Sequence, residues 1–309
     1  MKNSGSKITR DIVLVTGAAG GQQGRTGRHV AEMLLARGVP VRAFVHRSDA
    51  RSERLRARGA EVVEGDFLDY PSVRRAVRGV SSVYFAYPVQ EGLLDATAIM
   101  VAAAREAGVF RLVDLVMYLS SPDAPTPRMR QNYFSEQVFE WAGIGAAHVR
   151  ATVFYENIRA LVSPTLTTQG MVLLPWGSDR TAISLVSAED VARVVTGVLT
   201  GPPVPTGSVF PVIGEVLTLR DIVDTLGRVF DRTVRYEDIT DEQWRDGALA
   251  QGLNRHAVEH LSQLWRSIRA NPVASVVPDT IKRLGGVEPK TFEEFARQEK
   301  DSFTPQRKS

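Results

Sequence analysis

Short apolar runs rich in β-branched residues alternate with amphipathic stretches along the first half of the chain. The apolar runs predict strands at 12–16, 41–45, 61–63, 82–86, 112–119 and 146–153. The amphipathic stretches predict helices at 28–37, 49–58, 72–77, 93–107 and 133–141. Strands buried on both faces need no strict polar alternation, and alternating strands and helices build a parallel sheet. The pattern therefore predicts an α/β fold with a doubly wound parallel sheet.

The pattern loosens from about residue 155, where prolines interrupt it. Helix starts are still marked by a serine or threonine with an acid three residues later, at Ser187, Thr218 and Thr291. We expect a first domain over 8–154 and a smaller, mainly helical, substrate-side domain over 155–303. Two runs between about 181 and 213 predict strands that return to the main sheet, at 183–186 and 209–212.

Composition narrows the class of protein. Hydrophobic residues make up 43% of the chain and charged residues 24%, as in ordinary globular proteins. No apolar run reaches the length of a membrane span, and the first ten residues lack the apolar core of a secretory signal. Cysteine is absent, and the histidines show no metalloprotease-like spacing, although His256 and His260 lie four apart. The net charge of +3, without a basic stripe, does not indicate nucleic-acid binding. We expect a cytoplasmic, metal-free protein.

A glycine-rich turn joins the first strand to the first helix. Gly17 ends the strand, and Gly21, Gly24 and Gly27 follow with GxxGxxG spacing. Such glycines let the backbone approach a pyrophosphate, and the N-terminus of the next helix attracts the anion. Arg25 and Thr26 lie inside this turn. The strand–turn–helix context predicts a nicotinamide dinucleotide on a Rossmann-type domain, although a glycine turn without a ligand is the plainer alternative.

The end of the second strand distinguishes the two nicotinamide dinucleotides. An acid there would hold the ribose 2′-hydroxyl of NAD, but the strand ends in Phe44-Val-His-Arg47. Further arginines lie nearby at 42, 51 and 54. Because the planar guanidinium matches a phosphate, Arg47 predicts NADP(H) in preference to NAD(H).

Several motifs, in order, resemble the NmrA-like branch of the atypical short-chain dehydrogenase/reductase superfamily. The resemblance runs through Val13–Gly17, Gly24–His29, Val41–Arg47, Gly59–Asp66, Met117–Ser121, Val149–Asn157, Ser187–Ala192 and Thr291–Ala296. It covers nearly the whole chain. It departs from the family at the glycine-rich turn, which carries about three extra residues, so that either Gly17 or Gly21 could be the first glycine.

The resemblance implies roles for further residues. Asp66 and Phe67 would lie beside the adenine, while Ala86, Tyr87 and Pro88 would line the path of the ribose and nicotinamide. The segment 151–154, ending in Phe154, would approach the nicotinamide. The substrate cleft would hold Tyr155, Asn157 and Trp176. Core packing is the alternative for each of these aromatic residues.

The tyrosine–lysine pair that many members of the superfamily use is absent. In YxxxK, the lysine lowers the pKa of the tyrosine and holds the nicotinamide ribose. The nearest candidate here is Tyr133 with Gln137 in place of the lysine, and no lysine occurs between residues 8 and 281. Gln137 could bond the ribose but supplies no positive charge.

The resemblance leaves two functions open. The first is an NADPH-dependent oxidoreductase that reduces a small quinone-like or aromatic carbonyl substrate, for which positioning can replace a strong acid. The proton would come from Tyr133, His148, Tyr155 or solvent. The alternative is a non-catalytic NADP(H)-binding redox sensor that acts through a protein partner. An epimerase would normally need the missing pair. The apolar side of 131–141 would serve a homodimer or the core.

Overall fold

The computed structural model describes residues 11–20, 25–270 and 276–303. Its centre is a parallel sheet of seven strands in the order β10-β6-β5-β4-β1-β2-β3. These strands are β1 (Ile12–Thr16), β2 (Val41–Val45), β3 (Glu61–Glu64), β4 (Val80–Phe85), β5 (Arg111–Met117), β6 (Ala146–Ala151) and β10 (Ser208–Val212). The strand order reverses between β1 and β4, which is where a doubly wound sheet opens a crevice for ligands. The predicted fold class is confirmed.

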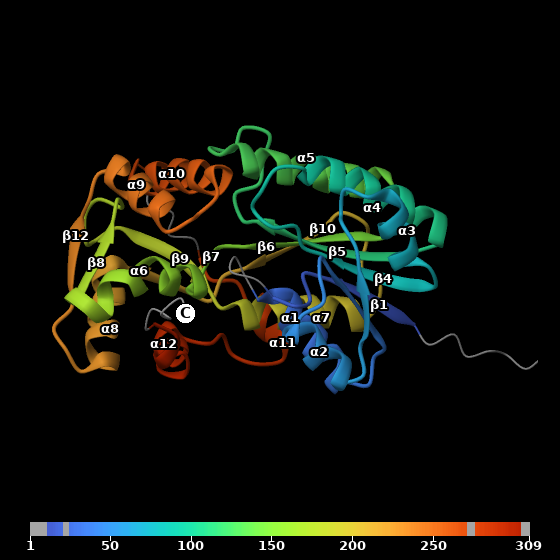
Figure 1. The fold of residues 1–309 in the computed structure, drawn as a ribbon, viewed down its shortest axis with the longest axis horizontal. Helices are drawn as coiled ribbons and strands as arrows, with labels where there is room; N and C mark the ends of the chain where they lie inside the picture. Colours follow the sequence, from blue (N-terminus) through green and yellow to red (C-terminus); the bar gives the residue numbers. More distant parts are fainter. Residues whose placement is uncertain (1–10, 21–24, 271–275, 304–309) are drawn as a thin grey trace, which may run out of the picture.

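Helices cover both faces of this sheet (Figure 1). One face carries α3 (Tyr70–Val77), α4 (Leu93–Ala107) and α5 (Pro127–Trp141), which pack side by side. The other face carries α1 (Thr26–Ala36), α7 (Ala188–Thr200) and α11 (Thr280–Gly285), with α2 (Ala50–Ala57) beside the β2–β3 edge. A separate cluster of buried apolar side chains lies under each helical layer. The strands carry apolar residues toward both clusters, which explains their unbroken hydrophobic runs.

The rest of the chain forms two small sheets and several helices beyond the carboxyl ends of the main strands (Figure 1). The three-stranded sheet has the order β11-β9-β7, with β7 (Val153–Phe154), β9 (Ala182–Val186) and β11 (Glu215–Thr218). The two-stranded sheet pairs β8 (Met171–Leu174) with β12 (Arg235–Asp238). The helices are α6 (Tyr155–Gln169), α8 (Leu219–Phe230), α9 (Asp241–Ala250), α10 (Arg255–Ala270) and α12 (Phe292–Gln298), followed by the 3₁₀ helix η1 (Lys300–Phe303).

The structure corrects one of the two strands predicted to return to the main sheet. β10 pairs with β6 there, but β9 pairs with β7 and β11 in the separate sheet. Its apolar run packs on the third cluster of buried side chains, with Ile183 and Leu185 inside it. A short apolar run shows that a strand is buried but does not show which core it faces.

The three helix starts predicted in the second half of the chain are confirmed. Ser187, Thr218 and Thr291 each cap their helix, accepting a backbone N–H from the third helical residue. Helix α5 begins at Pro127, several residues before the predicted start, and buries Met129 and Phe139 while Phe134 and Trp141 remain exposed. None of the described helices is long and apolar enough to cross a membrane.

Candidate functional site

A cavity of about 1130 Å³ opens where the carboxyl ends of β4, β5 and β6 meet the small sheets and helices. On one side it is lined by Pro88, which follows β4, by Tyr118, which follows β5, and by Phe154 of β7. Helices α9 and α10 line the other side, with Trp244 and Trp265 among their residues. One continuous space therefore joins the nucleotide-type crevice of the sheet to an aromatic and apolar region.

The glycine-rich turn provides the features expected for a pyrophosphate. Gly17 has a φ of +62°, which a side chain would strain, and Gly27 presses against the strand. A Cβ at Gly27 would lie 2.4 Å from the carbonyl oxygen of Thr16. The side chain of the N-cap Arg25 makes no cap hydrogen bond, so it leaves the first N–H groups of α1 to a ligand or to groups outside the described residues. Gly21 and Gly24 lie outside the described residues.

Arg51, not Arg47, is the arginine of this region that lines the cavity. Arg51 lies on α2 and donates to the carbonyl oxygen of Gly20 at 2.5 Å, so it reaches the glycine-rich turn. It also pairs with Asp49, and this hydrogen bond lowers the pKa of Asp49 to about 2. Arg47 is exposed just beyond β2. The sequence shows the cluster of arginines after the second strand, but it does not show that Arg51 reaches the glycine-rich turn.

The residues expected near the adenine and ribose gather at the same edge of the sheet. Phe67 lies edge-on against Phe44, Phe85 and Tyr87, with ring centroids 5.3–5.7 Å apart. The Asp66 carboxylate is exposed and accepts the N–H of Leu68 at 2.8 Å.

The segment after β4 is held against β1. The N–H of Ala86 donates to the Thr16 hydroxyl at 2.8 Å, which places Tyr87 and Pro88 at the cavity. The structure thus brings together the ends of β1, β3 and β4, as a shared crevice requires.

The side chains of helix α5 that face the cavity are not the predicted pair, Tyr133 and Gln137. Arg128, Met129 and Asn132 line the cavity, whereas Tyr133 and Gln137 do not. Tyr133 is half-buried, with its ring against Phe134 at 5.5 Å. Tyr133 and Gln137 match the spacing of YxxxK, but they do not lie on the side of α5 that lines the cavity.

His148 lies within the main sheet and away from the cavity, contrary to its expected role as a proton donor. It is fully buried, with Nδ1 2.6 Å from a carboxylate oxygen of Asp114 and Nε2 3.2 Å from one of Glu140. Burial lowers its pKa, but the neighbouring carboxylates outweigh this and raise the pKa above that of a free histidine. Its two nitrogens hold β5, β6 and α5 together.

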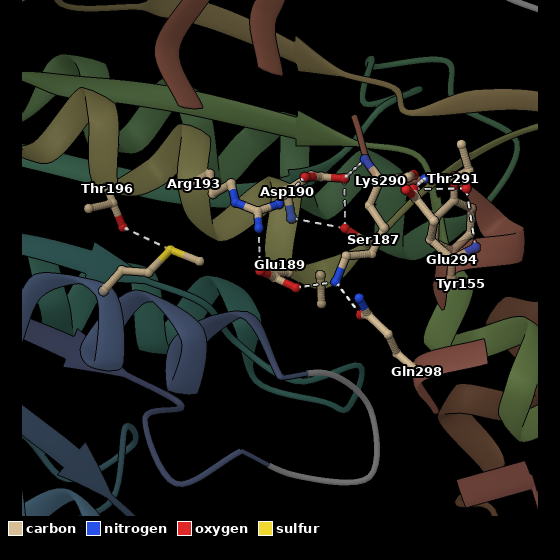
Figure 2. A network of polar contacts seen from close by, with 12 residues as sticks. Tyr155, Ser187, Glu189, Asp190, Arg193, Thr196, Lys290, Thr291, Glu294 and Gln298 are labelled. Carbon is tan, nitrogen blue, oxygen red and sulfur yellow. Dashed lines mark hydrogen bonds and ion pairs between the residues drawn. The ribbon is translucent and has the colours of Figure 1, made fainter. Parts of the chain in front are cut away.

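Tyr155 is also removed from the substrate cleft. It is fully buried, and its hydroxyl donates to Glu215 at 2.8 Å and to the carbonyl oxygen of Lys290 at 3.1 Å. Figure 2 shows it at the edge of a polar network that joins α7 to the segment entering α12. Burial, followed by the charge of Glu215, raises its pKa.

Trp176 and Asn157, the other two residues expected in the substrate cleft, differ in whether they line the cavity. Trp176 is buried against Trp265 at 4.9 Å and does not line the cavity, so its core-packing alternative fits the structure. Asn157 and Phe154 do line it. Large aromatic residues favour burial, but the sequence does not tell whether a cavity or a solid core receives them.

Sequence reasoning missed several polar residues at the cavity, namely Tyr118, Arg128, Asn132, Arg159 and His260. Tyr118 directly follows β5, inside the segment Met117–Ser121 that carried the family resemblance, and this was an available signal. The other four lie on helices whose facing the sequence left open. Among the described residues no group of three acidic, histidine or cysteine side chains could hold a metal ion.

The chain is similar in sequence to two curated reductases. It is 31% identical over 300 residues to a (4-alkanoyl-5-oxo-2,5-dihydrofuran-3-yl)methyl phosphate reductase of Streptomyces griseus, covering 96% of this chain and 100% of the relative. It is 26% identical over 293 residues to an NAD(P)H azoreductase of Xenophilus azovorans, covering 94% and 99% of the two chains.

Solved structures share the fold. The NADPH-dependent quinone oxidoreductase of Escherichia coli, complexed with NADPH, superposes with a TM-score of 0.79 at 20% identity, covering 93% of this chain and 99% of the other. The negative transcriptional regulator NmrA, in complex with NADP, superposes with a TM-score of 0.76 at 19% identity, covering 94% and 95%. A model of the NmrA-like family matches residues 9–296. With a match of that extent, the chain belongs to the NmrA-like family.

Proposed function

We propose that the protein is an NADPH-dependent oxidoreductase that reduces a small quinone-like or aromatic carbonyl acceptor. The main support is one continuous cavity that runs from Arg25 and Arg51, beside the glycine-rich turn, to the tryptophans of α9 and α10. A dinucleotide along the strand ends would leave the aromatic end for a planar acceptor. The relatives named as an NAD(P)H azoreductase and as a (4-alkanoyl-5-oxo-2,5-dihydrofuran-3-yl)methyl phosphate reductase support this proposal.

The residues present fit an NADP(H) molecule. The N-terminus of α1 and Arg25 would hold the pyrophosphate, while Arg51, with Arg47, would hold the 2′-phosphate. Asp66 and Phe67 would lie toward the adenine, and Pro88 and Phe154 toward the nicotinamide.

When bound, the reduced nicotinamide supplies a hydride, and a quinone that takes up this hydride and one proton becomes a hydroquinone. Tyr118 is the tyrosine we propose as the proton source, because it is half-buried and lines the cavity beside the end of β5. The hydroxyl of Tyr87, which also lines the cavity, instead donates to the carbonyl oxygen of Glu91. Solvent is the alternative source, since a quinone needs only a positioned hydride donor.

The first experiment measures NADPH and NADH binding by nicotinamide fluorescence and then follows NADPH oxidation with a neutral naphthoquinone. We expect Arg51→Met to weaken NADPH binding about 10- to 100-fold while changing NADH binding little, because only NADPH carries the 2′-phosphate. Arg54→Met, an exposed arginine on the same helix, is the matched control.

The outcomes separate the functions. Quinone-dependent oxidation supports the reductase, and a lower rate in Tyr118→Phe with an unchanged NADPH dissociation constant assigns the proton to the phenol. Tight NADPH binding without turnover on any acceptor would instead favour the non-catalytic sensor that acts through a protein partner. If neither nucleotide binds, both functions are wrong.

A further inference from the structure

The charges around the cavity are unbalanced. The lining residues include Arg25, Arg51, Arg128 and Arg159 but no aspartate or glutamate among the described residues. Arg25 and Arg159 both pair with Glu299, and Arg51 pairs with Asp49, in each case with a carboxylate outside the lining. Arg128 alone of the four has no carboxylate within 4.0 Å among the described residues. Arg128 is therefore the cavity arginine without a paired carboxylate among the described residues.

Arg128 is buried despite its charge. It is 3% exposed and donates to the carbonyl oxygens of Tyr87 at 2.9 Å and Gln90 at 3.2 Å, with its guanidinium over the Tyr87 ring. Its Nε is buried and has no hydrogen-bond partner among the described residues. Burial lowers its pKa to about 10, so it stays charged at neutral pH. Carbonyl groups and a ring offset only part of the desolvation of a buried cation.

The neighbours of Arg128 point to the acceptor end of the cavity. Asn132 lies one turn later on α5, is also buried at 4% exposed, and has an Oδ1 without a partner among the described residues. His260 of α10 lines the cavity nearby, and burial together with the charge of Arg128 keeps it neutral. A pyrophosphate at the N-terminus of α1 would already have Arg25 beside it. The free charge of Arg128 is therefore available to a second ligand.

We propose that Arg128 is a specificity-determining residue that binds an oxyanion group (a sulfonate, carboxylate or phosphate) on the acceptor. The inference rests on the proposed function, because it names the class of acceptor for the same site. The acceptor then has a planar ring at the apolar end, which Trp244 and Trp265 line, and an anionic substituent toward α5.

Binding to the wild-type protein provides the first test and needs no turnover. Calorimetric titration with NADP⁺ present would compare naphthalene-2-sulfonate with naphthalene-2-sulfonamide, which has nearly the same shape without the charge. We expect the sulfonate to bind about 10- to 100-fold more tightly, as charged hydrogen bonds imply. Equal binding of the two probes overturns the proposal.

Kinetics of variants provide the second test. We compare NADPH oxidation with 1,4-naphthoquinone-2-sulfonate and with 2-methyl-1,4-naphthoquinone. Arg128→Met should lower kcat/KM for the sulfonate at least about tenfold more than for the neutral quinone, mainly through KM, and Arg128→Lys should restore part of the difference. Arg130→Met, which removes an arginine bonded to the carbonyl oxygen of Ala124 outside the cavity, is the control.

The two tests also distinguish failure of this proposal from failure of the proposed reductase function. Equal losses with both quinones would make Arg128 a purely structural residue of the β4–α4 segment and overturn the proposal. If neither quinone is reduced by the wild-type protein, the reductase function fails, while a calorimetric preference for the sulfonate still supports an anion site at Arg128.

Discussion

At the scale of single residues, the surroundings of a buried histidine decide the direction in which its pKa is shifted. His260 is 4% exposed and its Nδ1 lies 3.1 Å from the Thr126 hydroxyl, at the start of α5. Burial, followed by the charges of Arg128 and His256, lowers its pKa to about 3. His148 shows the opposite direction because carboxylates surround it. The surroundings of two buried histidines of one chain therefore shift their pKa values in opposite directions.

The low pKa of His260 predicts a pH dependence of stability. In the unfolded chain the residue titrates near 6.5, whereas in the fold it stays neutral to about pH 3. The unfolded state thus binds more protons in this window, so stability is full above pH 6.5 and falls as the pH is lowered, by up to about 1.4 kcal/mol per pH unit. His260→Gln should flatten this decline in urea unfolding between pH 6.5 and 4.

The exposed His46 is the matched control, and His46→Gln should retain the wild-type decline. Parallel curves for wild type and His260→Gln would contradict the lowered pKa, because His260 would then take up protons equally in the folded and unfolded states.

At the scale of elements, the close contact of α1 with β1 joins folding to nucleotide binding. A Cβ at Gly27 would meet the carbonyl oxygens of both Thr16 and Gly17, at 2.4 and 2.6 Å, and neither backbone atom can move aside alone. Gly27→Ala should therefore push α1 away from the strand. We expect a loss of about 1–3 kcal/mol in the free energy of unfolding and at least about tenfold weaker NADPH binding.

Gly247→Ala on α9 is the control, because its added Cβ meets no atom within 4 Å. An alanine there should raise stability by about 0.5–1 kcal/mol, as expected within a helix. If Gly27→Ala retained both stability and NADPH affinity, the close packing of α1 would not matter for either.

The elements also show how far the sequence could predict the structure. The strand β1 and the helix α4 have the bounds that the hydrophobic pattern predicted, because local periodicity reports burial directly. Which cavity or core a side chain faces depends on distant partners. Tyr155 is turned away from the cavity by Glu215 and Lys290, which are 60 and 135 residues away in the chain. Arg128 was missed because α5 begins earlier than its apolar pattern suggests.

At the scale of the whole molecule, the C-terminal segment contacts both the helices of the main sheet and the helices beyond its strand ends. Helix α11 packs on α7 beneath the main sheet, while α12 packs on α8 and α6. Between them, the backbone N–H of Lys290 donates to Asp190 at 2.9 Å, and its ammonium group contacts Glu189 of α7 and Gln298 of α12 (Figure 2). Glu299 then reaches Arg25 and Arg159 at the cavity.

Lys290 is thus the residue at which loosening of this segment can be tested. Its side chain is only 13% exposed, so Lys290→Met should remove a sheltered ion pair and destabilise the protein by about 1–2 kcal/mol. Amide hydrogen exchange should rise first in α12, since Arg193 still holds Glu189 on α7. Lys282→Met is the control, because the pair of Lys282 with Glu288 is about two-thirds exposed and its loss should leave stability almost unchanged. Equal effects of the two variants would mean that the network around Lys290 does not join α7 to α12.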